Sequence, residues 1–372
     1  MTNTVTKDVI IIGGGIAGLW LLNRLVDAGF DAVLLTDRAL GSGQTIASQG
    51  MIHGGIKYAL SGTLTSASNT MASMPDYWSN CLAGAGDVSL ADTRLLSRTC
   101  YLWPRNSFRS RLNAFLGSKA LRGRVAPLPE ARFPDFFKNR ITGPLYQLSD
   151  IVLDVPSLLA SLSSRVQHRI HQTEQRKFMI DRQTGGAINS VSAATGTSAL
   201  TIKAQRYIFT AGEGNQSLLA QFGLEQTPMQ VRPLQMVMVQ HQFPDPIFVH
   251  CVADRLSSTP ELTITTHPYH KSGWVWYLGG ELAERGANLS EAEQITAARD
   301  KLTGLFPWCD FSGCRWSACH INRAEPAQAS GGRPDNAFLN PAHNFMVGWP
   351  TKLTLAPALA NMVLQELDKQ AI

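Results

Sequence analysis

Three glycines close to the N-terminus have the spacing of a phosphate-binding turn. Gly13, Gly15 and Gly18 fit the pattern G-x-G-x-x-G. In this pattern the first glycine permits a tight turn, the second lets a pyrophosphate approach the backbone, and the third allows close helix packing. Asp37 follows Gly18 by 19 residues, where an acid is expected on the adenosine ribose. These residues predict the binding of a dinucleotide.

The elements around this turn fit the prediction. Residues 8–12 form a β-branched run that enters the glycines, and apolar side chains then follow helical spacing over 16–26. Gly29 can end that helix, and 32–36 reads as the next strand. The positive end of the helix and its free N–H groups would face the phosphates. A glycine-rich turn in another α/β unit remains the alternative at this point.

Composition narrows the class of protein. The chain has 372 residues, enough for two domains, with 44% hydrophobic and 16% charged residues. Its net charge of +5 is modest and argues against a nucleic-acid binder. The first strand begins by residue 8 without a basic leader, so we expect a cytoplasmic protein. Cys309, Cys314 and Cys319 match no common metal-binding pattern, and no metal is expected.

One segment is strongly basic. Residues 98–140 carry ten Lys or Arg against Glu130 and Asp135, which gives the segment a charge of +8. Such a surface would suit an anionic substrate, a protein partner or a membrane. Phe133, Phe136 and Phe137 lie within it, and basic charge beside apolar rings suits peripheral membrane contact. A solvated surface of mixed charge is the plain alternative.

The rest of the chain alternates between helical and strand-like patterns. Residues 41–58 are rich in small polar side chains, which suit a segment lying along an extended cofactor. Residues 92–146 read as irregular. The other expected elements are helices over 65–82, 157–167, 291–306 and 355–368, an antiparallel meander over 170–202, and strands over 206–209, 231–250, 262–281, 316–323 and 345–348. Ser290 and Glu293 form a capping box before the third of these helices.

Together these segments resemble the D-amino-acid-oxidase-like superfamily of flavoproteins over nearly the whole chain. The resemblance rests on 13–18 with Asp37, and on the stretches 46–58, 152–156, 209–212, 316–326 and 348–354. It implies an α/β fold, α+β in part, with FAD as the cofactor. A split Rossmann-like FAD-binding domain with a parallel sheet would comprise residues 1–90, 151–225 and 335–372. A substrate domain built on an antiparallel sheet would comprise 91–150 and 226–334.

The resemblance also assigns cofactor contacts along the chain. The expected FAD-binding residues are Gly13, Gly15, Ile16, Ala17, Gly18, Asp37, Arg38, Thr45, Ser48, Gln49, Gly50, Met51, Ile52, Ala211, Gly212, Gly348, Trp349, Pro350, Thr351, Lys352, Leu353 and Thr354.

Two branches of the superfamily compete for this chain. The amino-acid sequences of 52–58 and 351–354 are similar to the corresponding motifs of FAD-dependent glycerol-3-phosphate dehydrogenases. The length is similar to glycine and sarcosine oxidases, and the additional helical domain after the last helix, typical of the dehydrogenases, is not expected. The closing motif lacks the extra glycines of the amine oxidases. Arg323 precedes Ala-Glu-Pro where an Arg-Pro pair is usual.

The resemblance implies roles for individual side chains. Arg323 would clamp an anionic group of the substrate. Lys57, Tyr58 and Tyr277 would contact substrate, and Lys352 would lie beside flavin and substrate as a catalytic cation. His53 is expected near the flavin, where its ordinary pKa of about 6.5 would suit a base. For Lys57, Tyr58, Tyr277, Lys352 and His53, the alternative is a side chain that is only packed or solvated. For Arg323, the alternative is a salt bridge.

The expected activity is hydride transfer from a small polar, anionic substrate to the flavin. Oxidation of a C–N bond, in an amino acid or secondary amine, is placed ahead of C–O oxidation of glycerol 3-phosphate or a 2-hydroxy acid. Oxygen or a quinone would accept the electrons. Two hypotheses from other functional classes remain: a non-catalytic flavin-bound module and a nicotinamide dehydrogenase.

Overall fold

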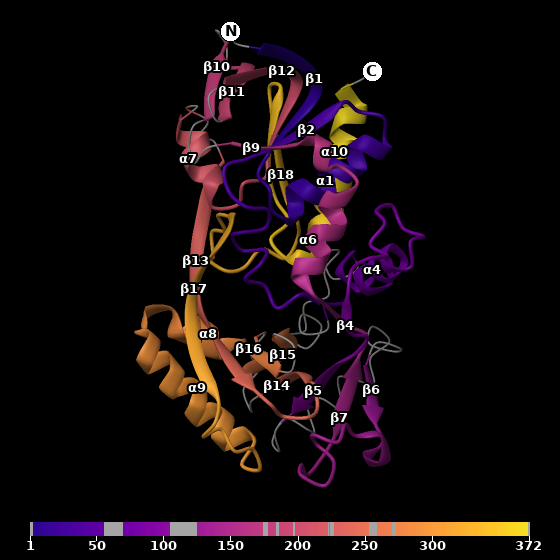
Figure 1. The fold of residues 1–372 in the computed structure, drawn as a ribbon, viewed down its shortest axis with the longest axis vertical. Coiled ribbons are helices and arrows are strands. Elements are labelled where there is room, and N and C mark those ends of the chain that lie inside the picture. Colours follow the sequence, from indigo (N-terminus) through magenta and orange to yellow (C-terminus); the bar gives the residue numbers. More distant parts are fainter. Residues whose placement is uncertain are drawn as a thin grey trace.

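The computed structural model describes residues 3–55, 70–104, 125–173, 178–183, 186–195, 198–221, 223, 227–252, 259–269 and 273–370. They form two lobes, each built on a large sheet (Figure 1). The expected fold class, a Rossmann-like α/β region combined with an antiparallel sheet, is confirmed.

The first lobe contains the parallel sheet, in the order β19-β12-β1-β2-β9. An antiparallel hairpin, β10 and β11, extends β12, and β18 pairs with β19. The strands are β1 (Asn3–Ile12), β2 (Ala32–Thr36), β9 (Ile170–Gln172), β10 (Phe178–Arg182), β11 (Ile188–Thr195), β12 (Ser198–Phe209), β18 (Phe338–Ala342) and β19 (Phe345–Trp349). The last part of the predicted meander and the predicted strand over 206–209 form one continuous strand, β12. This strand starts beside β11 and ends beside β19.

Helices cover one face of this sheet. They are α1 (Ile16–Asp27), α6 (Val155–Ser164) and α10 (Ala356–Gln370), with α4 (Met74–Leu82) farther out (Figure 1). Pro156 lies in the first turn of α6, and the Asp154 carboxylate accepts from the Ser157 N–H at 3.0 Å. The other face packs against β10, β11 and α7 (Gly214–Gln221). None of the helices among the described residues is long and apolar enough to cross a membrane.

The second lobe is built on a sheet in the order β17-β13-β16-β15-β14-β5-β7-β6, antiparallel except for the parallel pair β14–β5. Its strands are β5 (Cys100–Pro104), β6 (Val125–Leu128), β7 (Leu145–Leu148), β13 (Met229–His241), β14 (Phe248–Val252), β15 (Leu262–Tyr269), β16 (Gly273–Gly279) and β17 (Arg315–Pro326). The prediction that 92–146 is irregular was therefore wrong. The strands within 92–146 are too short to show a periodic pattern in the sequence. They form because they pair with neighbouring strands of the sheet.

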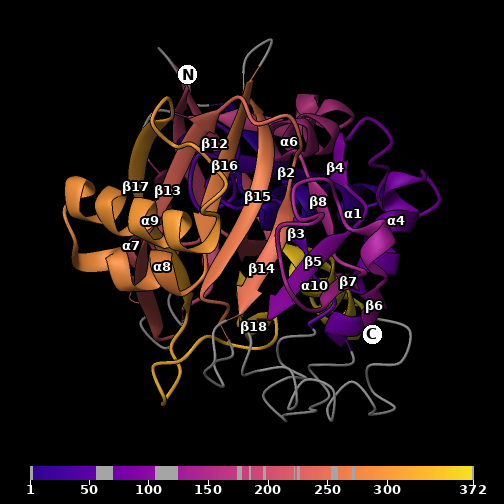
Figure 2. The ribbon, with the colours of Figure 1, turned by 90° about the horizontal axis from the view of Figure 1, so that it is seen from below.

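Two connections join the lobes. A small sheet links β3 (Met51–Ile52), β8 (Ile151–Leu153) and β4 (Leu95–Ser97). The long strands β13 and β17 pair from Met229 opposite Pro326 to Gln240 opposite Arg315, and they run from the parallel-sheet lobe into the other (Figure 1). Helix α9 (Glu291–Leu305) lies over these strands (Figure 2), and its predicted capping box is confirmed.

The core of the second lobe is aromatic. Phe136, Phe306 and Trp276 contact one another edge to face, and Phe133 and Phe137 belong to the same cluster. Phe133, Phe136 and Phe137 are therefore buried. These three rings therefore do not supply an exposed apolar surface for membrane contact. Residues 105–124, which carry much of the segment's positive charge, lie outside the described residues.

Two buried histidines of this lobe should make its stability depend on pH. Burial lowers the pKa of His241 and that of His267 to about 4. The Nδ1 atom of His241 accepts the Phe243 N–H at 3.0 Å, which fits a neutral ring. Between about pH 6.5 and pH 4 the unfolded chain binds protons that the native protein does not. The free energy of unfolding should therefore fall as the pH is lowered through this window, by up to about 3 kcal/mol per histidine.

Urea unfolding followed at pH 7, 6, 5 and 4.5 measures this slope. His241→Phe keeps an aromatic ring beside Trp276 and should flatten the slope, whereas exposed His168→Gln should leave it unchanged. Equal slopes in the wild-type protein and His241→Phe would show that His241 does not contribute.

Candidate functional site

A cavity of about 1310 Å³ lies where the two lobes meet. One wall comes from the glycine turn, from 35–53, from 210–221 and from 348–354. The opposite wall comes from β13, β14, β17 and α8 (Glu281–Arg285). Ligand pockets usually measure about 300–1,000 Å³. This cavity is large enough for an extended cofactor together with a small substrate.

The glycine turn has the geometry that its spacing predicts. Gly13 has φ +124°, and a Cβ there would lie 2.6 Å from the Ala211 nitrogen. A Cβ on Gly18 would lie 2.0 Å from the Gly13 carbonyl oxygen, so Gly18 serves packing, and it does not line the cavity. Gly15 differs, because a Cβ there would meet only Thr45 Oγ1, at 3.3 Å. The open space beside Gly15 is where a pyrophosphate would fit.

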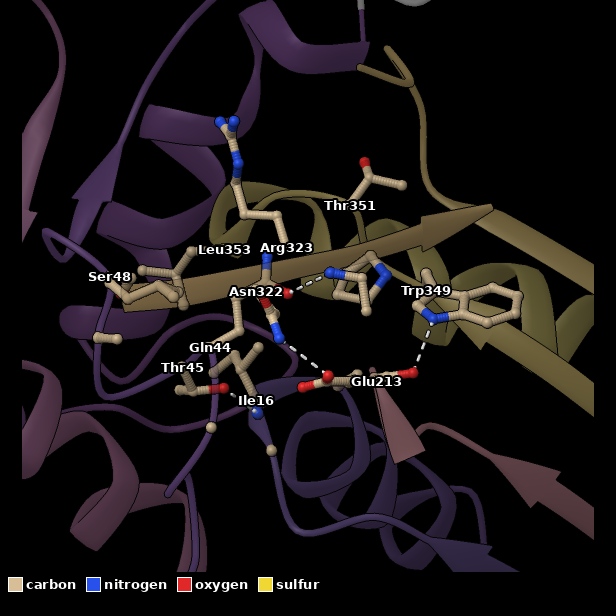
Figure 3. Close-up of a pocket in the computed structure, with 18 of the residues that line it drawn as sticks. Ile16, Gln44, Thr45, Ser48, Glu213, Asn322, Arg323, Trp349, Thr351 and Leu353 are labelled. Carbon is tan, nitrogen blue, oxygen red and sulfur yellow. Dashed lines mark hydrogen bonds between the residues drawn. The ribbon is translucent and has the colours of Figure 1, made fainter. Parts of the chain in front are cut away.

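The N-terminus of α1 faces the same space. The Ile16 N–H donates to Thr45 Oγ1 at 3.1 Å, which ties the segment 41–48 to the start of the helix (Figure 3). Asp37 and Arg38 follow β2 and line the cavity, as do Ile16, Ala17 and Ser48. Together they offer helix N–H groups for phosphate and a carboxylate for ribose hydroxyls.

The closing loop 348–354 completes this wall. Trp349 Nε1 donates to the Gly212 carbonyl oxygen at 3.1 Å, so the loop is tied to the end of β12 (Figure 3). Thr351 has φ +59°, and its hydroxyl donates to the Asn336 carbonyl at 2.9 Å. The short helix Leu353–Leu355 then begins at the cavity, and α10 follows it directly. The first N–H groups of a helix have no acceptor within it.

Lys352 lines the cavity but is held by backbone. Its Nζ donates to the carbonyl oxygens of Pro334 and Asp335 at 2.9 and 2.8 Å, and the side chain is 3% exposed. The geometry gives Lys352 a structural role in fixing the 334–335 segment. Its expected catalytic role stays a prediction.

The segment 48–53 is anchored to both lobes. Gln49 Nε2 donates to the carbonyl oxygens of Tyr277 at 2.9 Å and Thr263 at 3.2 Å. The backbone of Gly50 (φ +66°) lies too close to the Leu153 carbonyl, 2.1 Å from an added Cβ, for any side chain. Gly50 and Ile52 do not line the cavity, whereas Gln49 and Met51 do.

The remaining expected substrate contacts divide into three groups. His53 lines the cavity, and its backbone N–H donates to Thr354 Oγ1 at 3.2 Å. Tyr277 does not line it, because its ring stacks against His267 with the centroids 4.4 Å apart. Lys57 and Tyr58 lie outside the described residues.

Three arginines line the cavity near the closing loop. Arg232 and Arg323 stand directly opposite each other on β13 and β17. Arg333 donates from Nη2 to the Thr351 carbonyl at 3.3 Å. Burial lowers the pKa of the Arg323 guanidinium, and Arg232 and Arg333 lower it further, while Glu284 opposes them. An arginine stays protonated in proteins, so the cluster concentrates positive charge.

Two carboxylates accompany this cluster. Glu325, 1% exposed, accepts from Arg232 Nε. Glu284, on α8, accepts from Arg323 Nη1 at 3.0 Å and lines the cavity. Buried N–H groups of Arg232 (Nη2) and Arg333 (Nε) have no acceptor within the described part of the chain. Donors of this kind suit an anionic ligand.

Sequence reasoning missed several of these residues. Arg232 and Glu284 stand on elements without a motif. Strand alternation places 232, 234 and 236 on one face of β13, and this was the only signal in the sequence for Arg232. His250 also lines the cavity. Its Nδ1 lies 2.8 Å from Thr263 Oγ1, and its Nε2 lies 4.0 Å from a carboxylate oxygen of buried Asp150.

Gly15 allows cofactor binding to be separated from folding. Its φ of −81° suits alanine, and the added methyl would meet only the Thr45 hydroxyl. Gly15→Ala should therefore fold, with a melting temperature close to that of the wild-type apoprotein, but it should retain at least about tenfold less FAD, because the methyl occupies the pyrophosphate space. Flavin absorbance after gel filtration measures this. Gly304→Ala, which meets no neighbour, is the control, and equal flavin content in both variants would contradict the assignment.

Comparisons with known proteins agree with this geometry. A family model described as FAD dependent oxidoreductase matches residues 8–363. The chain is 41% identical over 375 residues to the probable FAD-dependent oxidoreductase PA4991 of Pseudomonas aeruginosa, covering 100% of this chain and 93% of that protein. The crystal structure of PA4991 superposes with a TM-score of 0.85, at 38% identity, over 100% and 93% of the two chains.

More distant structures share the fold alone. Glycine oxidase from Geobacillus kaustophilus has a TM-score of 0.68 at 17% identity, covering 98% of this chain and 95% of its own. An L-alpha-glycerophosphate oxidase from Mycoplasma pneumoniae, determined with FAD bound, has a TM-score of 0.69 at 15% identity, with 98% and 95% covered. From the family match and the relative at 41% identity, the chain belongs to the DAO family of FAD-dependent oxidoreductases and is an enzyme.

Proposed function

We propose that this FAD-dependent oxidoreductase oxidises a small anionic substrate at a C–N bond, in an amino acid or a secondary amine. The observation that carries the proposal is the cluster of Arg232, Arg323 and Arg333 on the cavity wall, next to the closing loop. A carboxylate accepts paired N–H groups from a guanidinium, and such charge-assisted hydrogen bonds are about twice as strong as neutral ones.

The proposed cofactor contacts follow the geometry of the first lobe. Gly15, Thr45 and the start of α1 would hold the pyrophosphate, and Asp37 the adenosine ribose. The closing loop and the start of the short helix Leu353–Leu355 would lie beside the flavin ring. The flavin, when bound, accepts two electrons from the substrate. The protein's part is to orient the substrate and to exclude water.

Arg323 is the proposed anchor for the substrate anion. It is 12% exposed, and its backbone segment is fixed because the Ala324 N–H donates to Gln44 Oε1 at 3.2 Å. Figure 3 shows Asn322 directed towards Glu213, with a 2.9 Å hydrogen bond, whereas the Arg323 side chain points away from Glu213. The alternation of β17 thus places Arg323 on the face of the strand that also bears Ile321.

C–O oxidation of glycerol 3-phosphate or a 2-hydroxy acid is the second candidate. Arginines bind phosphate as well as carboxylate, and the motif spelling of 351–354 supports this branch. The fold does not separate the two, since a glycine oxidase and a glycerophosphate oxidase superpose with nearly equal TM-scores. Oxygen or a quinone is the proposed electron acceptor.

Anaerobic bleaching of the flavin tests the substrate class. Holoenzyme with roughly one flavin per chain is mixed with primary amino acids, N-methyl amino acids, 2-hydroxy acids or glycerol 3-phosphate. The absorbance band of the oxidised flavin near 450 nm is then followed. We expect loss of the band with an amino acid or N-methyl amino acid. Bleaching by glycerol 3-phosphate or a hydroxy acid alone would establish the second candidate instead.

Arg323→Ala should weaken substrate binding selectively. Loss of a charge-assisted contact should raise the concentration for half-maximal bleaching by about 10- to 100-fold, with flavin content unchanged. The matched control is Arg285→Ala, whose side chain pairs with Glu281 at the surface. Equal losses of substrate and flavin binding in Arg323→Ala would sink the assignment of Arg323 to the substrate.

A further inference from the structure

The contact between Arg323 and Glu284 carries information about the substrate beyond its negative charge. Arg323 Nη1 lies 3.0 Å from Glu284 Oε1, and both side chains line the cavity. An anionic substrate that binds Arg323 must therefore share this guanidinium with a carboxylate of the protein. What becomes of Glu284 then depends on the chemistry of the substrate.

Of the two carboxylates beside the arginines, only Glu284 is placed to change partner. Glu325 is 1% exposed and is enclosed with Arg232. The Glu284 side chain is 35% exposed and stands on the short helix α8. Leu234, Met236 and Ala283 line the cavity beside it and would exclude water from a ligand seated there.

A simple anion on Arg323 would compete with Glu284 for the cation that Glu284 contacts. If a hydroxy acid or phosphate bound Arg323, two negative groups would compete for one guanidinium, and Glu284 would be covered without a cation. A covered charge without a partner is strongly unfavourable. A zwitterion avoids this, because its anion takes Arg323 while its ammonium takes Glu284. Binding then exchanges one ion pair for two and leaves the net charge of the site unchanged.

We propose that Glu284 is the receptor for a substrate ammonium group and that Arg323 and Glu284 together select α-amino acids or N-substituted amino acids over their oxygen analogues. The inference rests on the proposed function, since it assumes that the anion binds at Arg323. It makes Glu284 a specificity-determining residue, and it favours C–N over C–O oxidation on grounds independent of chain length.

Matched pairs of ligands that differ at one atom test this directly. Sarcosine and methoxyacetate each carry one carboxylate, and iminodiacetate and diglycolate each carry two; within each pair an NH₂⁺ group replaces an ether oxygen. Dissociation constants are measured by anaerobic calorimetry on the dithionite-reduced holoenzyme, in which the amines cannot be oxidised. The readout is therefore binding and not turnover.

We expect the wild-type enzyme to bind the amine of at least one pair about tenfold or more tightly than the ether, the scale of one charge-assisted contact. Glu284→Gln should bring that ratio to within about threefold. Arg323→Lys should weaken both members of the pair by similar factors. The control Glu281→Gln, on the same helix but bonded to Arg285, should keep the wild-type ratio.

The possible failures are distinguishable. A ratio that is unchanged in Glu284→Gln, with flavin content intact, overturns the role of Glu284 and leaves the anion site standing. A wild-type enzyme that binds the ethers as tightly as the amines overturns it as well. If none of the four ligands binds the wild-type holoenzyme, the proposed anion site itself is contradicted, and the assignment of Glu284 fails with it.

Discussion

The pairing of β13 with β17 is the constraint on which the site depends. It runs without interruption from Met229 to Gln240 and places Arg232 opposite Arg323 on one face. Directly paired residues of antiparallel strands have Cβ atoms about 5 Å apart, and like charges there are destabilising. Glu325 and Glu284 offset this repulsion, each from a different element. The register therefore creates both the positive charge and the need for carboxylates around it.

The cavity exists because the two lobes are joined at several fixed points around it. Gln49 carries hydrogen bonds from the cofactor wall to β15 and β16, and Gly279 leaves the room that its side chain needs. On the other side, the Ala324 N–H of β17 donates to Gln44 Oε1, and Asn322 Nδ2 donates to Glu213 Oε1. One lobe thus carries the proposed cradle for the cofactor, and the other carries the proposed wall for the substrate.

What could be read from the sequence was local. The glycine turn and the capping box at Ser290 each depend on residues within a few positions, and both are present as expected. The arginine cluster could not be read in this way, because Arg232 and Arg323 are 91 residues apart and meet only through strand register.

For two other expected residues, too, the sequence does not give the tertiary contacts of the side chain. Tyr277 was expected at the substrate, yet alternation along β16 does not say which face meets the cavity, and its ring packs on His267. Lys352 has the right place in the loop, but its ammonium is bound to the carbonyls of the 334–335 segment. Side-chain type and spacing located the wall of the site, and tertiary contacts determined which groups are available to a ligand.

The central claim is that Arg323 and Glu284 exchange their mutual contact for the two ends of a zwitterion. A crystal structure of the reduced holoenzyme with bound iminodiacetate tests this most directly. We expect a carboxylate oxygen at about 3 Å from the Arg323 guanidinium and the ligand nitrogen at about 3 Å from a Glu284 oxygen. A ligand whose nitrogen points away from Glu284, with the Arg323–Glu284 contact intact, would contradict it.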